Sequence, residues 1–279
     1  DVLKNEPLII SHEVKENKDN WHGLSIEVEF EGKYTSKVDE YLELIWLTNP
    51  YLKIVYELNG EKKVFERITN ELPPAPKEIK PHPYGIELGI LKRMAAFTKA
   101  DNMISFLIKE FSRIGKDTAE KILKLANIDA NKNPKDLSNE EIERLFKAMQ
   151  KVKIRAPPTD CLSPINDKYL LQALKKIFPA EAYSVVTRKP SVYRGFPFQV
   201  QAAIAYKLKN SEELKILRFA NHTPLLYNLY DCAITKTIMQ INWNQYGISQ
   251  SGNFPNEPMV ILVDFLSVWI PYKSEGKQA

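Results

Sequence analysis

The stretch that decides the fold reads Phe111-Ser112-Arg113-Ile114-Gly115-Lys116-Asp117-Thr118-Ala119-Glu120-Lys121-Ile122-Leu123. Apolar residues recur at three- and four-residue steps both before and after Gly115, which is the periodicity of an amphipathic helix. We expect Gly115 to take the positive φ that ends the first helix, and Asp117 or Thr118 to cap the second. The stretch therefore predicts two helices hinged on one glycine.

Helical patterns continue on both sides of this hinge, from residue 86 to residue 153. The last helix is predicted to begin at Ser138, because Ser138-x-x-Glu141 is a capping box. Its buried stripe is expected to consist of Ile142, Leu145, Phe146 and Met149. A group of prolines precedes the helical region and Pro157-Pro158 follows it, and since proline removes backbone donors, both places are predicted domain boundaries.

The first 72 residues read as strands around one helix. Residues 8–14 and 24–30 are β-rich, and the second run alternates faces. Ser36 is expected to cap a helix that Pro50 closes. A strand over 51–58, the type I′ turn signal Asn59-Gly60 and a return strand over 63–67 predict a β-hairpin.

Strand patterns return after the second boundary. A helix over 169–178 is followed by an alternating run over 198–206 and an apolar run over 214–219, which we expect to form an antiparallel pair. A helix over 231–241 then leads to a buried strand over 259–266. The order β-β-α-β is predicted for this part, and α+β for the whole chain.

Composition limits the function classes. The 279 residues are 44% hydrophobic and 27% charged, which is typical of a folded protein with two or three domains. No apolar run reaches the length of a membrane span. The two cysteines show neither metal-ligand nor disulfide spacing, so we expect a reducing, cytoplasmic location and no metal site. A net charge of +4 is compatible with nucleic acid without arguing for it.

Three motifs together resemble one family. They are the hinged helix pair, which resembles a helix-two-turn-helix unit, the run Lys80-Pro81-His82-Pro83-Tyr84-Gly85, and the run Arg218-Phe219-Ala220-Asn221-His222-Thr223-Pro224-Leu225-Leu226. The family is the B subunit of topoisomerase VI, a type IIB DNA topoisomerase, and the resemblance covers essentially the whole chain. It implies the tail of a GHKL-type ATPase domain (residues 1–72), a helix-two-turn-helix domain (73–154) and a transducer of ribosomal protein S5 domain 2-like type (155–279), truncated at its C-terminus.

The resemblance also implies a function. In this family ATP and Mg²⁺ bind to the B subunit, which dimerises on ATP, and its transducer passes that closure to an A subunit in a heterotetramer. The A subunit cuts double-stranded DNA so that a second duplex can pass. The Asn and the Asp-x-Gly-x-Gly that hold nucleotide in the family are missing from residues 1–72. We therefore interpret the chain as a fragment and expect it to be inactive alone.

Two nucleotide-facing places are carried over from the family. Its His-Gly-Thr corresponds to His22-Gly23-Leu24, where leucine supplies no hydrogen-bonding group. Its lysine-bearing loop corresponds to Pro271-Tyr272-Lys273-Ser274-Glu275-Gly276-Lys277. The resemblance implies that Lys277, beside Gly276, contacts the γ-phosphate of ATP, a task suited to a point charge on a flexible stem. Lys273 is the weaker candidate, and a solvated tail is the alternative.

DNA contact is predicted at two places. The family's Trp-Lys-x-Tyr loop corresponds to Trp243-Asn244-Gln245-Tyr246, where asparagine removes the charge, so packing of Trp243 and Tyr246 is an equal alternative. The hinged helix pair offers Arg113, Lys116, Lys121 and Lys124. Acidic residues lie among them, so a solvated helix face is the alternative to a weak DNA patch.

A second function remains open from the sequence. The chain can belong to a non-catalytic relative that keeps the transducer as an assembly module without ATP turnover. Leu24, Asn244 and the unusual Asp264 in the last strand favour that reading, whereas Lys277 argues against it.

Overall fold

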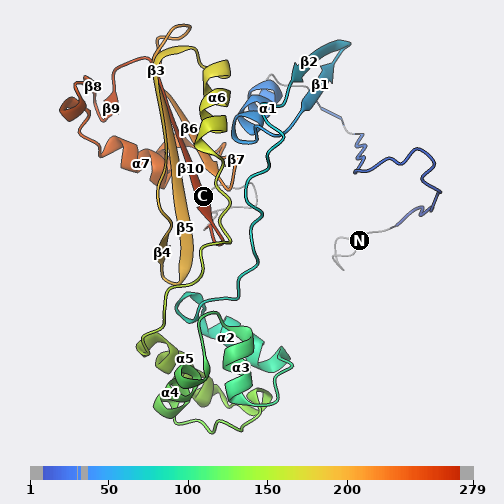
Figure 1. Cartoon of the computed structure of the whole chain (residues 1–279), viewed down its shortest axis with the longest axis vertical. Coiled ribbons are helices and arrows are strands. Elements are labelled where there is room, and N and C mark those ends of the chain that lie inside the picture. The colour runs from blue at the N-terminus through green and yellow to red at the C-terminus, as the bar shows by residue number, and fades with distance from the viewer. Residues whose placement is uncertain (1–8, 30, 33–36, 271–279) are drawn as a thin grey trace. The chain divides into compact units, whose positions relative to one another are not determined.

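The structure is a computed structural model that describes residues 9–29, 31–32 and 37–270, with the side chains of all of these except Lys37 (Figure 1). It divides into two units, residues 1–36 and 37–279. The described residues of the first unit form neither helix nor strand, so the strands expected over 8–14 and 24–30 are wrong for those residues. Leu24, Ile26 and Val28 are 81%, 74% and 70% exposed. An alternating run becomes a strand when another strand pairs with it, and the described part of this unit supplies none.

The second unit begins with a helix and a hairpin. Helix α1 (Lys37–Thr48) ends just before Pro50, as predicted, and it buries Trp46 and Leu47, whereas Ser36 lies outside the described residues. Strands β1 (Ile54–Leu58) and β2 (Glu61–Phe65) pair antiparallel. Asn59 and Gly60 have φ values of 51° and 86°, which confirms the type I′ turn.

The helical region has a core of its own. It contains α2 (Leu88–Phe97), α3 (Met103–Glu110), α4 (Lys116–Ala126) and α5 (Asn139–Lys151), with 3₁₀ turns η1 (Pro83–Gly85) and η2 (Pro134–Asp136). All four helices contribute buried residues to one cluster. The capping box is confirmed, because the Ser138 hydroxyl accepts from the Glu141 N–H and the Glu141 carboxylate accepts from the Ser138 N–H.

The turn between α3 and α4 differs from the prediction. Gly115 has φ −98° and is the N-cap of α4, while Arg113 takes the positive φ of 62°. Asp117 therefore lies inside the first turn of α4 rather than capping it. Phe111 and Ile114 on either side are 1% and 6% exposed. Both side chains point into the core. The residues between them must therefore reverse the direction of the chain, and Arg113 does so with its positive φ.

The last part is a mixed sheet with helices on both faces (Figure 1). Its main strands are β3 (Ala180–Thr187), β5 (Phe196–Leu208), β6 (Lys215–Ala220) and β10 (Met259–Ser267), in the order β3-β5-β10-β6-β7. The smaller elements are β4 (Ser191–Tyr193), β7 (Thr223–Pro224), η3 (Leu229–Asp231), η4 (Trp243–Tyr246), β8 (Gln250–Ser251) and β9 (Phe254–Pro255). The predicted α+β class is confirmed.

Strand β10 occupies the centre of the sheet. It pairs antiparallel with β5 and parallel with β6, so the expected direct β5–β6 pair is wrong. Eight of its nine residues are apolar or small, and a strand with such a run is suited to burial on both faces. Helix α6 (Asp167–Ile177) and α1 cover one face, and α7 (Ala233–Met239) with Trp243 covers the other.

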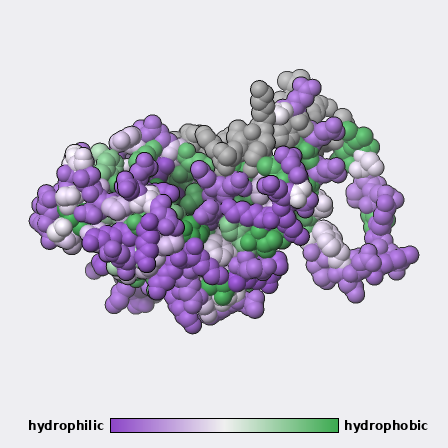
Figure 2. Space-filling model, turned by 90° about the horizontal axis from the view of Figure 1, so that it is seen from above, coloured by the Kyte–Doolittle hydropathy of each residue, from purple (hydrophilic) through white to green (hydrophobic). Residues whose placement is uncertain are grey.

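On the face shown in Figure 2, hydrophilic residues predominate and apolar residues appear in scattered patches. Among the helices described, none is long and apolar enough to cross a membrane.

Candidate functional site

The turn between β6 and β7 holds the end of β10. Asn221 and His222 both adopt left-handed backbone conformations, with φ values of 46° and 63°. The Asn221 side chain donates to the Ser267 carbonyl and accepts from the Ser267 N–H, both at 3.0 Å. This paired contact copies the hydrogen bonding of a neighbouring strand, so the turn is fixed to the last residue of β10.

His222 forms a buried ion pair with Asp264 of β10. Its Nδ1 lies 2.6 Å from the Asp264 Oδ2, and its Nε2 lies 2.8 Å from the Ser163 carbonyl oxygen. Asp264 is fully buried. Because a carboxylate and a carbonyl both accept, each ring nitrogen must carry a proton, and the ring is an imidazolium.

The same contacts change the acidity of the ring. Burial by itself lowers the pKa of His222, but the hydrogen bond and charge of Asp264, with the Ser163 carbonyl, outweigh it. The pKa of His222 therefore lies above its ordinary value. The charged form that the geometry requires is the form that these neighbours stabilise.

Segments distant in sequence meet at this turn. The Thr48 hydroxyl at the end of α1 donates to the His222 carbonyl at 2.9 Å. The Ser163 hydroxyl donates to the Pro74 carbonyl at 2.6 Å. The junction, defined as Thr48, Pro74, Ser163, His222 and Asp264, thus joins four parts of the chain. They are α1, the proline segment (residues 73–83), the segment before α6, and the sheet.

Gln201 of β5 holds the segment before α6 in place. Its side chain is fully buried and makes both an accepting and a donating bond to the backbone of Ile165, at 2.8 Å and 2.7 Å. Its Nε2 also donates to the Thr187 hydroxyl at 2.6 Å. The segment is therefore tied to the sheet at Ile165 as well as at Ser163.

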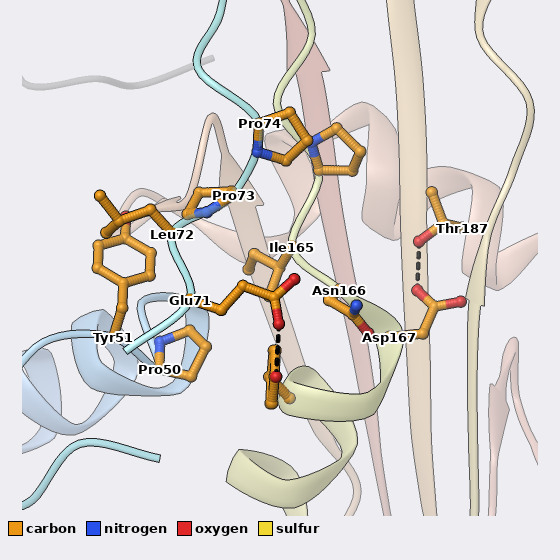
Figure 3. A pocket seen from close by; sticks show the side chains of 12 residues that line it. Pro50, Tyr51, Glu71, Leu72, Pro73, Pro74, Ile165, Asn166, Asp167 and Thr187 are labelled. Carbon is orange, nitrogen blue, oxygen red and sulfur yellow. Dashed lines mark hydrogen bonds between the residues drawn. The ribbon is translucent and has the colours of Figure 1, made fainter. Parts of the chain in front are cut away.

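Two cavities flank the junction along the proline segment. One, of about 500 Å³, has His222, Asn221 and Ser163 in its wall. The other, of about 370 Å³, lies near the start of α6 (Figure 3). There the Tyr169 hydroxyl donates to Glu71 at 2.6 Å, and the Thr187 hydroxyl donates to Asp167 (Figure 3). Leu72, Pro73 and Pro74 belong to both walls, so the two cavities lie along the same stretch of chain.

Apart from the junction, another close contact joins the helical region to the turn between β4 and β5. A Cβ on Gly195, which has φ 81°, would lie 2.8 Å from the Gly85 nitrogen, and a Cβ on Gly85 would lie 2.9 Å from the Phe196 ring. His82 is buried there, accepting from the Tyr84 N–H and donating to the Arg155 carbonyl at 2.9 Å. Burial lowers the pKa of His82, consistent with a neutral ring. Two adjacent backbones approach closely because neither glycine has a side chain.

The comparisons with known proteins agree with this architecture. Residues 157–279 match the family model described as the topoisomerase VI B subunit, transducer. The chain is 41% identical over 283 residues to the B subunit of type 2 DNA topoisomerase 6 from Methanococcoides burtonii, an alignment that covers 99% of this chain and 45% of the relative. The chain belongs to the topoisomerase VI B-subunit family.

Other members of the family give the same picture. The corresponding protein of Archaeoglobus fulgidus is 40% identical over 287 residues, covering 99% of this chain and 47% of the relative. That of Saccharolobus islandicus is 37% identical over 287 residues, covering 100% and 53%. The chain thus spans about half the length of the curated relatives it matches.

The residues predicted to contact nucleotide from the family resemblance are not assembled into a site in the described part of the chain. Leu24 is exposed and carries no polar side-chain atom. Lys273, Gly276 and Lys277 lie outside the described residues. Among the described residues no group of acidic, histidine or cysteine side chains is placed to hold a metal ion. The described residues therefore do not form a site that fits ATP and Mg²⁺.

The predicted DNA-contact residues separate into two groups. Arg113, Lys116, Lys121 and Lys124 are all exposed on α4 and the turn before it. Lys116 lies 4.0 Å from Glu120, and the Arg113 Nε donates to the Ala156 carbonyl. These side chains share one region of the surface, with acidic neighbours as the sequence showed.

In the Trp243–Tyr246 loop, one of the two predicted DNA-contact residues is buried and the other is exposed. Trp243 is 5% exposed, donates from its indole nitrogen to the Ile238 carbonyl, and packs in the cluster under α7. Tyr246 is 71% exposed. The structure therefore places Trp243 as a packing residue, and it leaves Tyr246 accessible.

Sequence reasoning missed the pairing of His222 with Asp264 at the junction. His222 belongs to a motif that the sequence singled out, and Asp264 stood out as a carboxylate within an apolar strand. An acidic residue in such a strand signals a buried partner, because an unpaired buried charge is costly. The two residues are 42 positions apart in the sequence, and no local pattern identified His222 as that partner.

Proposed function

We propose that this chain is the part of a topoisomerase VI B subunit that transmits ATP-driven closure of the B-subunit dimer to a partner A subunit, which passes double-stranded DNA. Membership of the family and the match to its transducer support this reading. Residues 1–72 then belong to the end of a GHKL-type ATPase domain and 73–154 to a helix-two-turn-helix domain. On this proposal the chain alone neither binds nor hydrolyses ATP.

The observation that carries the proposal is the junction. It fastens the end of α1 to the sheet through the His222 carbonyl, and it fastens the segment before α6 to β10 through the His222 ring. β10 is followed in the sequence by residues 271–277, where the family resemblance implies the lysine that contacts the γ-phosphate. A displacement at the C-terminal end of β10 is therefore expected to reach α1 through the contacts of the junction.

The experiment uses the full-length protein with its A subunit and compares three variants. Lys277→Ala is expected to lower both ATP turnover and relaxation of supercoiled DNA at least tenfold, roughly 1.4 kcal/mol of lost transition-state stabilisation. Lys273→Ala is expected to change them much less. Thr48→Val removes the hydroxyl that bonds to the turn and keeps the side-chain volume, so relaxation is expected to fall more than ATP turnover.

A matched control is Thr98→Val, which removes a buried hydroxyl that donates to Glu110 within the helical region, away from the junction. Its DNA relaxation is expected to stay near the parental rate. If Lys277→Ala relaxes DNA at the parental rate, the nucleotide role is wrong. If Thr48→Val and Thr98→Val behave alike, the junction does not transmit closure.

The non-catalytic scaffold is the second candidate. It is favoured by Leu24, whose position corresponds to a hydrogen-bonding threonine in the family. The two readings separate in one measurement, because the full-length scaffold would hold an A subunit without hydrolysing ATP.

A further inference from the structure

Two segments of the chain connect the helical region to the sheet (Figure 1). One is the proline segment, and the other is the segment before α6, which comprises residues 152–166. They are tied to each other twice. The Ser163 hydroxyl donates to the Pro74 carbonyl at 2.6 Å. The Lys77 N–H donates to the Asp160 carbonyl at 3.0 Å, and the two side chains form an ion pair at 3.1 Å. A contact that holds Ser163 in place therefore also bears on the proline segment.

The segment before α6 is held to the sheet by two side chains, and only one of them can titrate. At Ile165 the Gln201 amide bonds both the N–H and the carbonyl of the backbone. At Ser163 the His222 Nε2 lies 2.8 Å from the carbonyl oxygen. An amide keeps its hydrogen bonds as pH changes, whereas an imidazole gains or loses a proton. The contact at Ser163 is therefore the one that a change of pH can break.

Loss of one ring proton leaves His222 with one donor between two acceptors. The remaining proton belongs on Nδ1, which lies 2.6 Å from the Asp264 carboxylate. Asp264 is fully buried, and a buried carboxylate without its donor costs more than a carbonyl without one. Nε2 then turns a lone pair toward the Ser163 carbonyl oxygen. Two acceptors at 2.8 Å repel each other, so this contact opens and the contact with Asp264 stays.

The neighbouring cavity can receive the separated groups. Ser163 and His222 both lie in the wall of the cavity of about 500 Å³. A water molecule in that space can donate to both Nε2 and the Ser163 carbonyl, so neither acceptor is left unpaired. Because the Gln201 amide keeps its bonds to Ile165, the movement is confined to the residues before Ile165.

The other titratable groups near the ring do not produce the same effect. Tyr51 and Cys161 share the cavity wall with His222, and burial raises the pKa of both, which favours their neutral forms. A hydrogen bond from Lys77 lowers the pKa of Asp160, so that carboxylate stays ionised. From α1, the group that contacts the turn is the Thr48 hydroxyl, which does not titrate.

We propose that His222 is a pH-sensitive latch, which holds the segment before α6 and the proline segment to β10 and releases them at Ser163 when Nε2 loses its proton. The latch is closed at low pH and opens as pH rises. Its opening is expected above about pH 6.5, because Asp264 and the Ser163 carbonyl stabilise the charged ring. The release does not depend on the proposed function, although an effect on the transmission of closure would.

The test is nuclear magnetic resonance of the intact chain between pH 6 and pH 9.5. The ¹⁵N shifts of the ring show which nitrogen carries a proton, and the signals of His222 are those that disappear in His222→Gln. Nε2 is expected to lose its proton while Nδ1 keeps its own. His82 is the internal control, because burial lowers its pKa and its ring nitrogens should change little over this range.

Amide hydrogen exchange measures the release itself, with each rate divided by that of an unstructured peptide at the same pH. The Leu162 N–H, which donates to the Thr159 carbonyl, is expected to lose protection at least about tenfold as the ring titrates. The Ile165 N–H, which Gln201 holds, should not change. His222→Gln should abolish the pH dependence at Leu162. Because the parent is titrated as well, the test does not depend on the folding of this variant.

Ser163→Ala tests the link between the two segments. It removes the hydroxyl that bonds Pro74 and keeps the carbonyl that His222 holds. In the parent the amide shift of Ala75, next to Pro74, should follow the titration of the ring, and in Ser163→Ala it should not.

Three results would overturn the latch. They are loss of the Nδ1 proton first, retention of both ring protons to pH 9.5, and an equal loss of protection at Leu162 in His222→Gln. An Ala75 shift that ignores the ring in the parent would overturn the link to the proline segment. Because all of these measurements report structure, their failure is distinguishable from failure of the proposed function, which DNA relaxation tests.

Discussion

At the scale of single residues, His222 makes the stability of the protein depend on pH. Its folded-state pKa is raised, so it contributes stability that is fully present below the unfolded value of about 6.5 and is lost as pH rises through the folded value. His82 acts in the opposite direction: its pKa is lowered, so it costs stability as pH falls below about 6.5. Between these two residues, the change of the free energy of unfolding above pH 6.5 therefore comes from His222.

Urea unfolding at pH 6, 7, 8 and 9 measures this effect. The free energy of unfolding of the parent is expected to decline over this range relative to His222→Gln, which cannot titrate. Tyr51 and Cys161, beside the same cavity, have pKa values raised by burial, and they are present in both proteins, so the comparison cancels them. Parallel curves for the two proteins would show that the His222–Asp264 pair is not ionised as the geometry requires.

At the scale of elements, the contact between Gly195 and Gly85 fixes the helical region to the β4–β5 turn. Gly195→Ala places a Cβ at positive φ and 2.8 Å from a backbone nitrogen that cannot move away independently. We expect a loss of about 1–3 kcal/mol in the free energy of unfolding. Gly89→Ala is the matched control, because Gly89 lies in α2 with nothing within 4 Å of the added Cβ.

The control should stabilise the protein by about 0.5–1 kcal/mol, as expected for alanine replacing glycine inside a helix. Chemical denaturation of both variants measures the two effects. Equal stability of Gly195→Ala and the parent would mean that the β4–β5 turn does not pack against η1 in solution.

The elements also show how far sequence reasoning reaches. The capping box at Ser138 and the turn at Asn59-Gly60 were predictable because the interactions that form them lie within four residues. The position of β10 between β5 and β6 was not, because strand order is set by which apolar surfaces pack together across long separations. Arg113 took the positive φ expected of Gly115 because two core side chains fixed the turn.

The candidate site follows the same rule. The motif around His222 was visible in the sequence, and so was the oddity of Asp264, since both are local departures from pattern. Their pairing, the Gln201 clamp on Ile165 and the burial of Trp243 depend on the sheet order and on α7, so they required the structure. Residues that resemble family motifs were thus found, and those that couple elements were not.

At the scale of the whole molecule, the modest net charge of +4 sets the DNA affinity that we expect. Plausible contacts come from Arg113, Lys116, Lys121 and Lys124, which are exposed together, and these side chains neutralise phosphates without reading bases. Binding to duplex DNA should be weak, indifferent to sequence, and weaker by roughly tenfold to a hundredfold at 200 mM than at 50 mM salt.

Fluorescence titration of labelled duplexes at several salt concentrations measures this. Replacing Lys121 and Lys124 by glutamine should reduce the slope of log K against log salt by about two, because two released counterions are lost. The same change at Lys62 and Lys209, which are exposed on β2 and after β5, removes equal charge away from α4 and should leave the slope nearly unchanged. If both pairs of variants reduce the slope equally, the affinity reflects net charge and not a patch on α4. A sequence preference that survives high salt would also contradict the prediction, because it would require base contacts that these side chains do not explain.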